Sequence, residues 1–220
     1  MQIQGFSCTR PQPEHMDAML ACATAAELDA LVAAGAYTTD VSRALYLVAR
    51  RHSDAVTTGV VCCCSADELG GKIACEQVEE GAATARADEL ESLGAHARPI
   101  TIAYEGNMAL DLILGAARSA TPLYNLLNGA DQLVVWRMSR PEAIEAVMAT
   151  FATIEGHVVA GQLEAAAAQE VARRARKARP ELDPRAAALH PLALLVSEAE
   201  LAVGSADLLP GEGLLVHRFA

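Results

Sequence analysis

The sequence predicts an α/β fold with a predominantly parallel sheet of four to six strands and helices on both faces. Two observations carry this prediction. Short apolar runs alternate with segments of helical periodicity along most of the chain. Three of the runs, 59–64, 132–138 and 192–196, end at an S/T-x-x-E capping box, in which a hydroxyl and a glutamate satisfy backbone groups at a helix start.

Length and composition are typical of one domain with an aliphatic core. Hydrophobic residues make up 52% of the 220 residues and aromatic residues only 4%, so thin strands and close-packed helices are favoured over an aromatic-rich sandwich. We expect a single domain over 1–220. Its expected parts are a helical lead-in at 9–52, a βαβαβα core at 53–155, a helical insertion at 156–190 and a final strand–helix–strand unit at 191–220.

The first predicted elements are an edge strand ahead of the lead-in and two helices within it. Weak alternation in residues 1–8 predicts an edge strand. A capping box at Thr24 predicts the start of one helix, and the spacing of Val41, Leu45 and Val48 predicts a second.

The later elements follow the apolar runs. Strands are predicted at 59–64, 99–104 and 132–138, each followed by a helix, and the last unit contains strands at 192–196 and 213–219. The helix after 132–138 is expected to continue into the insertion, so that 141–179 forms a long helical region. The right-handed crossover rule would then set the hand of each unit.

Charge and cysteine usage limit the class of protein. There are 28 acidic and 17 basic residues, for a net charge of −11, which argues against general nucleic-acid binding. No charged segment followed by an apolar one precedes Arg10, so we do not expect a signal peptide. Uncharged runs such as 55–66 fall short of the roughly 18 residues that a membrane-spanning helix requires. Cys62, Cys63 and Cys64 are consecutive, a poor disulfide framework, so we expect reduced thiols and a cytoplasmic location.

Polar residues directly after the predicted strands form the candidate ligand site. Ligands of parallel sheets bind at the carboxyl ends of the strands, where helix N-termini present backbone N–H groups. The expected ligand is a small anion bearing phosphate or carboxylate, with an arginine as its counter-charge. The alternative is that the polar residues only cap helices. The candidates are Ser65, Asn107, Ser139 and Arg140.

Cys64 and Glu105 are the candidate catalytic residues. A thiol at a strand end, just before a helix N-terminus, has its thiolate favoured and is a candidate nucleophile. Glu105 and Asp111 form a candidate carboxylate pair for acid–base chemistry. The alternatives are that Cys64 packs in the core and that Glu105 is a solvated loop residue. Neither a metal nor a cofactor is expected, because paired zinc-ligand spacings and nucleotide-binding glycine motifs are missing from the sequence.

A basic cluster in the long helical region suggests a partner. Its residues are Arg173, Arg174, Arg176 and Lys177, followed by Arg179. The cluster is either a docking patch for an acidic partner or a second copy, or a solvated set of cations at a helix C-terminus. Because 141–179 is too long for one crossover helix, we expect a homodimer with this region in the interface.

Two functions remain open at this point. The first is a cytoplasmic α/β enzyme that acts on a small anionic substrate at the carboxyl ends of the strands, with Cys64 as nucleophile. The second is a non-enzymatic interaction or regulatory protein that binds a partner, or itself, through 141–179. The grouping of polar residues favours the first, and the lack of a complete catalytic motif favours the second.

Overall fold

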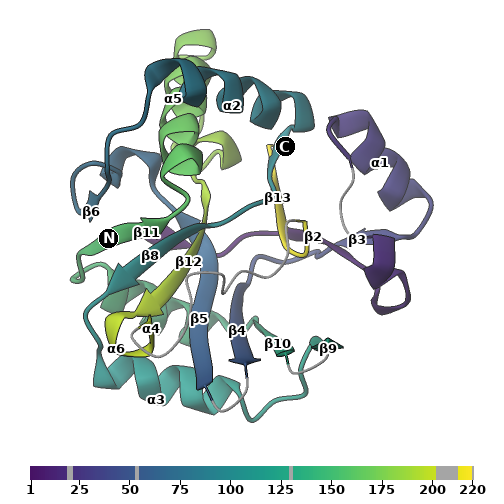
Figure 1. Ribbon diagram of the computed structural model, residues 1–220, viewed down its shortest axis with the longest axis vertical. Coiled ribbons are helices and arrows are strands. Elements are labelled where there is room, and N and C mark those ends of the chain that lie inside the picture. The colour runs from purple at the N-terminus through teal and green to yellow at the C-terminus, as the bar shows by residue number, and fades with distance from the viewer. Residues whose placement is uncertain (19–21, 53–54, 129–130, 202–212, 220) are drawn as a thin grey trace.

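The computed structural model describes residues 1–18, 22–52, 55–128, 131–201 and 213–219. Within them the strands form two sheets (Figure 1). The large sheet has nine strands in the order β6-β11-β8-β12-β5-β4-β10-β9, with β1 beside β5. The small sheet has the order β3-β2-β13-β7.

The bounds of the elements are as follows. The large sheet comprises β1 (Ile3–Gln4), β4 (Leu45–His52), β5 (Ala55–Cys64), β6 (Ile73–Ala74), β8 (Ile100–Tyr104), β9 (Tyr124–Asn128), β10 (Asp131–Met138), β11 (Gly156–Ala160) and β12 (Leu192–Ser197). The small sheet comprises β2 (Cys8–Pro11), β3 (Tyr37–Thr39), β7 (Ala95–His96) and β13 (Val216–Arg218). The helices are α1 (Ala25–Ala33), α2 (Glu80–Leu93), α3 (Met108–Ala117), α4 (Pro141–Phe151), α5 (Gln162–Ala178) and α6 (Glu198–Leu201), with short 3-10 turns η1 (Pro13–Ala18), η2 (Ala66–Glu68) and η3 (Ala187–Leu189).

The prediction of a predominantly parallel sheet is wrong. In the large sheet β12 runs parallel to β8 and β11 parallel to β6, whereas the other pairings are antiparallel. The apolar runs indicated strands buried on both faces, which is usual for parallel sheets. Here α3 and α4 contribute to the core on one face and the small sheet to the core on the other, so the antiparallel strands are buried on both faces as well.

The region predicted as a helical lead-in also differs. Residues 9–52 contain α1, but most of their length forms β2, β3 and β4. The spacing of Leu45 and Val48 resembled a helical face, yet β4 alternates: Leu45 and Leu47 enter one core, and Tyr46 and Val48 the other. β4 then pairs along its length with β5 as an antiparallel hairpin.

The predicted helical insertion at 156–190 is interrupted by a strand. Residues 156–160 form β11, which pairs with β8, and Gly161 then adopts a left-handed φ of 84° before α5 begins. A Cβ at Gly156 would come within 2.7 Å of the Ile102 side chain, so glycine permits this close strand approach. The stretch 141–179 is therefore α4, β11 and α5 rather than helical throughout, and the interruption falls between Gly156 and Gly161.

The positions of the predicted strands are confirmed, and so are several local details. The runs 59–64, 99–104, 132–138 and 192–196 fall within or nearly coincide with β5, β8, β10 and β12. The Thr24 box caps α1 with both reciprocal hydrogen bonds. All six cysteines are free thiols, and Cys63 packs in the core opposite to that of Cys62 and Cys64. None of the described helices is long and apolar enough to cross a membrane.

Candidate functional site

A cleft of about 840 Å³ lies at one end of the large sheet. β5 and β10 end there, and β4 and β12 begin there, because these neighbours run antiparallel. Four segments form its walls: β1 and its flanks, the loop before β4, one side of α4 along its length, and the turn that leads into β12. The lining residues are Gln2, Ile3, Gln4, Gly5, Ser42, Arg43, Ser139, Pro141, Ile144, Glu145, Met148, Ala149, Ala152, Pro184, Arg185 and His190.

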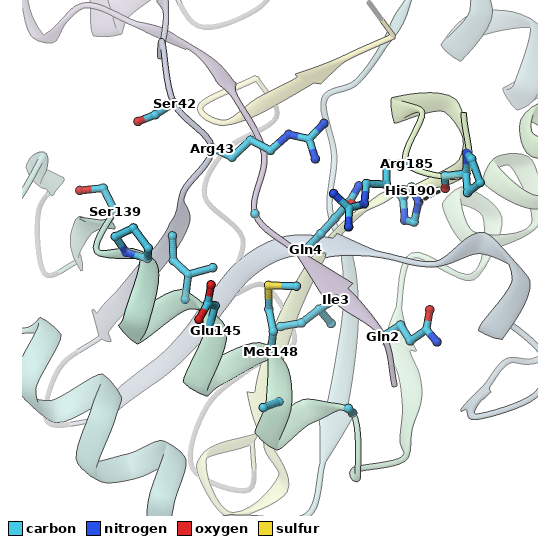
Figure 2. Close-up of a pocket in the computed structure, with 16 residues that line it drawn as sticks. Gln2, Ile3, Gln4, Ser42, Arg43, Ser139, Glu145, Met148, Arg185 and His190 are labelled. Carbon is cyan, nitrogen blue, oxygen red and sulfur yellow. Dashed lines mark hydrogen bonds between the residues drawn. The ribbon is translucent and has the colours of Figure 1, made fainter. Parts of the chain in front are cut away.

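One part of the cleft is cationic. Figure 2 shows the side chain of Arg43 extending toward Arg185 and His190. Among the described residues neither Arg43 nor Arg185 has an ion-pair partner, although the chain carries an excess of acidic residues. Two unpaired guanidinium groups in one concave site attract an anion and hold phosphate or carboxylate with a planar set of donors.

His190 is oriented by a hydrogen bond at the edge of this part. Its Nε2 lies 2.8 Å from the carbonyl oxygen of Pro184. Since a carbonyl only accepts, Nε2 carries the proton and the neutral ring has Nδ1 as an acceptor. A protonated His190 would instead add a third positive charge to the cleft.

The loop before β4 is held in place by a partly buried ionic network. Arg137 of β10 donates to both the carbonyl and the hydroxyl oxygen of Ser42, at 2.9 and 2.8 Å. Arg137 also pairs with Asp40 at 3.1 Å, and Arg10 pairs with the other oxygen of that carboxylate at 2.9 Å. Because the Ser42 hydroxyl oxygen accepts from Arg137, its own proton remains available to a ligand in the cleft.

Asp40 is the centre of this network and remains ionised. Burial opposes its charge, but hydrogen bonds from Arg10 and Tyr46, together with the charges of Arg10 and Arg137, outweigh burial and hold the pKa of Asp40 below its usual value. The charged carboxylate in turn fixes the two arginines, and through Arg137 it fixes the position of Ser42 beside Arg43.

The opposite part of the cleft is apolar with one carboxylate. Glu145 and Met148 project from α4 (Figure 2), and Ile144, Ala149 and Ala152 complete that wall. The whole cleft thus has a cationic part and an apolar part, which suits a small anion that carries an apolar group.

The candidate nucleophile does not lie in the cleft. Cys64 pairs with Ile3 of β1, which lines the cleft, but its side chain is fully buried in the core beneath. Burial raises the pKa of the Cys64 thiol to about 12. These are the properties of a core thiol, since a nucleophilic cysteine needs exposure and a lowered pKa. The helix expected directly after it is only the short turn η2.

Three of the predicted ligand residues lie at this end of the sheet. Ser139 lines the cleft. Arg140 is the N-cap residue of α4, makes no side-chain capping bond and is not among the lining residues. Ser65 accepts a hydrogen bond from the Asp67 N–H at 3.3 Å as the cap of η2. For Ser65 the structure therefore agrees with the alternative that the residue caps a helical turn.

Glu105 and Asn107 lie at the opposite end of the sheet. β8 is parallel to β12 and therefore antiparallel to β5, so its carboxyl end is remote from Cys64. Asn107 caps α3 by accepting from the N–H groups of Ala109 and Leu110 at 3.0 and 3.2 Å. Glu105 is an exposed loop residue. The antiparallel sheet thus separates residues that a parallel sheet would have brought together.

The basic cluster on α5 is largely neutralised within the chain. Arg173 and Arg174 pair with Glu170, Arg174 also pairs with Asp88 and Glu91 of α2, and Arg176 pairs with Asp67. Lys177 remains exposed without a described ion pair. These contacts fasten α5 to α2 and η2, which weakens the argument for a docking patch.

Part of the apolar surface of 141–179, where a homodimer interface was expected, is covered within the chain itself. Val171 of α5 packs against Ala87 and Leu90 of α2, and Val158 is buried in β11. Val159 and Leu163 of the same region are partly exposed. The homodimer itself remains a prediction.

Sequence reasoning missed Ser42, Arg43, Arg185 and His190. The available signal was the alternation from Leu45 to Val48, which indicates a strand. Pairing that strand antiparallel to 131–138 would have placed the loop that precedes it beside Ser139, because Leu45 is the register partner of Met138. Nothing local marks Arg185 and His190, since only the pairing of β12 brings them to the cleft.

Comparison with known proteins assigns a family. The profile of DUF1015, described as a protein of unknown function, matches residues 9–205, most of the chain. The chain belongs to the DUF1015 family. No curated protein and no solved structure matches it significantly. Within this DUF1015 protein the matched region includes Ser42, Arg43, Ser139, Arg185 and His190, whereas β1 precedes it and β13 follows it.

Proposed function

We propose that this DUF1015 protein binds a small organic anion in the cleft, with phosphate or carboxylate on Arg43, Arg185 and His190. The observation that carries the proposal is the convergence of two arginines, neither paired with an acidic residue in the described part of the chain, on one concave site in a protein of net charge −11. Exposed arginines of an acidic protein usually find carboxylates, and here others do so on α5. A ligand with its own negative charge would complete the cleft.

The apolar wall narrows the ligand class. An inorganic anion would use only the cationic part of the cleft, whereas a ligand with a short aliphatic chain would also cover Ile144, Met148 and Ala149. Burying apolar surface is worth roughly 25 cal/mol per Å². We therefore propose an organic phosphate or carboxylate rather than the free ion.

The same cleft holds groups suited to proton transfer on such a ligand. His190 offers Nδ1 as an acceptor in its neutral form, Glu145 offers a carboxylate from α4, and Ser42 offers a hydroxyl held by Arg137. We propose that any enzymatic activity uses these residues, not Cys64. Binding is the first property to test, because it does not depend on the reaction.

The test is a thermal-shift titration with hexyl phosphate, hexanoate, inorganic phosphate and hexanol. We expect both organic anions to raise Tm more than inorganic phosphate, and hexanol to have no effect. Saturation at about 100 times Kd stabilises by about 2.7 kcal/mol. For a chain of this size each kcal/mol raises Tm by about 2–4 °C.

Variants of cleft residues and a matched control test whether the rise in Tm comes from binding in the cleft. R43Q and R185Q should each remove most of the shift, whereas K177Q removes an exposed cation from α5 and should leave it unchanged. A149E should abolish the advantage of hexyl phosphate over inorganic phosphate. Equal responses of R43Q, R185Q and K177Q, or no response of the unaltered protein to any anion, would refute the proposal.

A further inference from the structure

α3 is apolar around its whole circumference but is covered on one side only. Asp111 is the only charged residue from Met108 to Ala117. Leu110 and Leu114 are buried in the main core, whereas Met108 and Leu112 are 80% and 72% exposed. A helix that is apolar on all sides is normally buried on all sides. The outer face of α3 is therefore an apolar surface that no other part of the described chain buries.

The outer face has large residues at one end and small residues at the other. Met108 and Leu112 project from the first turns, and Gly115, Ala116 and Ser119 follow on the same side. A Cβ built at Gly115 meets no atom within 4 Å. The end with Met108 and Leu112 protrudes and the end with Gly115 and Ala116 is recessed, so the two ends are complementary in shape.

Two exposed apolar residues lie on the face of the large sheet that α3 packs against. Arg118 donates to the Thr58 hydroxyl at 3.4 Å and so lies over β5 at the end of α3. Val56, on the same face of β5 as Thr58, and Leu127, on the same sheet row, are exposed as well. In Figure 1 α3 runs beneath the ends of β5 and β4. We call Met108, Leu112, Gly115 and Ala116, on the outer face of α3, the α3 surface.

We propose that the α3 surface binds the same surface of a second copy, with the two α3 helices antiparallel across a twofold axis. A twofold interface requires one patch that complements itself. In an antiparallel pair, a register that sets Leu112 against the partner's Gly115 also sets Met108 against the partner's Ser119. The large end of each helix then fills the small end of the other.

Charge complementarity supports the same arrangement. In that register Asp111 lies opposite the partner's Ala116, beside the partner's Arg118. Asp111 is exposed, and the Arg118 guanidinium has donors left after its bond to Thr58. The twofold axis repeats this pair, so each copy supplies one charge of each sign. None of the residues of the α3 surface lines the cleft, and the inference is independent of ligand binding.

The decisive experiment measures the mass of the full chain in solution by sedimentation velocity over a dilution series. We expect a dimer that dissociates on dilution. L112E places a carboxylate in the centre of the interface and should weaken dimerisation about tenfold or more. V41E is the matched control, because Val41 is fully exposed outside the α3 surface, and it should dimerise like the unaltered chain.

Two further variants separate the interface from effects on folding. G115L fits the open space of the monomer but collides with the partner's Leu112, so it should retain Tm and lose the dimer. D111R and R118D should each weaken dimerisation, and the double variant D111R/R118D should restore it. A monomer at tens of micromolar, or a dimer that L112E and G115L leave intact, would overturn the proposal.

Discussion

The imidazole rings of His96 and His217 stack with centroids 6.5 Å apart in the small sheet, and neither Nε2 atom has a hydrogen-bond partner among the described residues. Burial, followed by the charges of His217 and Arg86, lowers the pKa of His96 to about 3. Burial, followed by the charges of His190 and Arg43, lowers the pKa of His217 to about 4. Both rings are therefore neutral in the folded protein at neutral pH.

This pair predicts a loss of stability on mild acidification. Between pH 6.5 and about 4 the unfolded chain takes up protons on both histidines and the folded chain does not, so the free energy of unfolding falls as pH falls. The slope should approach about 1.4 kcal/mol per pH unit for each histidine. Urea denaturation from pH 4.5 to 7 measures it, above the range in which carboxylates dominate. H96F/H217F should flatten the profile, and an unchanged slope in this variant would contradict the assignment.

Removing the charge of Asp40 should destabilise the fold and disturb the cleft. D40N leaves Arg10 and Arg137 partly buried without their shared counter-charge, for which we expect a loss of about 3 kcal/mol. D29N breaks the exposed pair with Arg218 and serves as the control, with an expected loss below about 1 kcal/mol. Chemical denaturation gives both values. Similar losses in the two variants would mean that the network does not stabilise the protein.

Two capping boxes that look alike in sequence should respond differently to alanine. Thr24 makes both bonds of its box, so T24A should cost about 1 kcal/mol. Ser139 begins the same pattern, but the cap position of α4 is Arg140 and no side-chain bond is made there. S139A should therefore leave stability nearly unchanged. A cost for S139A equal to that of T24A would show that α4 begins differently in solution.

Alkylation kinetics should divide the six thiols into two groups. Cys22 and Cys75 are partly exposed, whereas Cys8, Cys62, Cys63 and Cys64 are buried, and burial raises the pKa of all six thiols. Brief treatment with limiting iodoacetamide should label the first two, and the rest should react only after denaturation. Peptide mapping identifies the sites. Rapid selective labelling of Cys64 would restore it as a candidate nucleophile.

Local patterns in this sequence located the strands made of continuous apolar runs, missed β4, β9 and β11, and predicted strand directions poorly. The apolar runs at 59–64 and 192–196 became strands because burial on both faces demands apolar residues whatever the direction of the neighbour. Direction depends on connections. The β4–β5 hairpin was lost when Leu45 and Val48 were assigned to a helix, and without it the capping boxes favoured parallel crossovers.

The candidate site residues were likewise predicted correctly where local sequence places them and incorrectly where their position depends on strand direction. Ser139 was predicted to bind a ligand and lies in the cleft, because its place after β10 does not depend on the rest of the sheet. Glu105 and Asn107 were placed beside it only on the assumption of a parallel sheet, which puts them at the wrong end. Arg43 and Arg185 come from distant loops, so only the tertiary fold brings them together.

The small sheet has a consequence for how the chain reaches its native state during synthesis. β13 fills the gap between β2 and β7: Val216 pairs with Thr9, and His217 pairs with both Cys8 and His96. Every strand of the large sheet precedes 216–218 in the chain, so the large sheet can assemble before β13 docks, whereas the small sheet cannot close without it. Until β13 docks, the face of the large sheet that carries Tyr46 lacks part of its cover. Such late, long-range closure slows folding and makes the nascent chain a natural client for chaperones that bind exposed apolar surface.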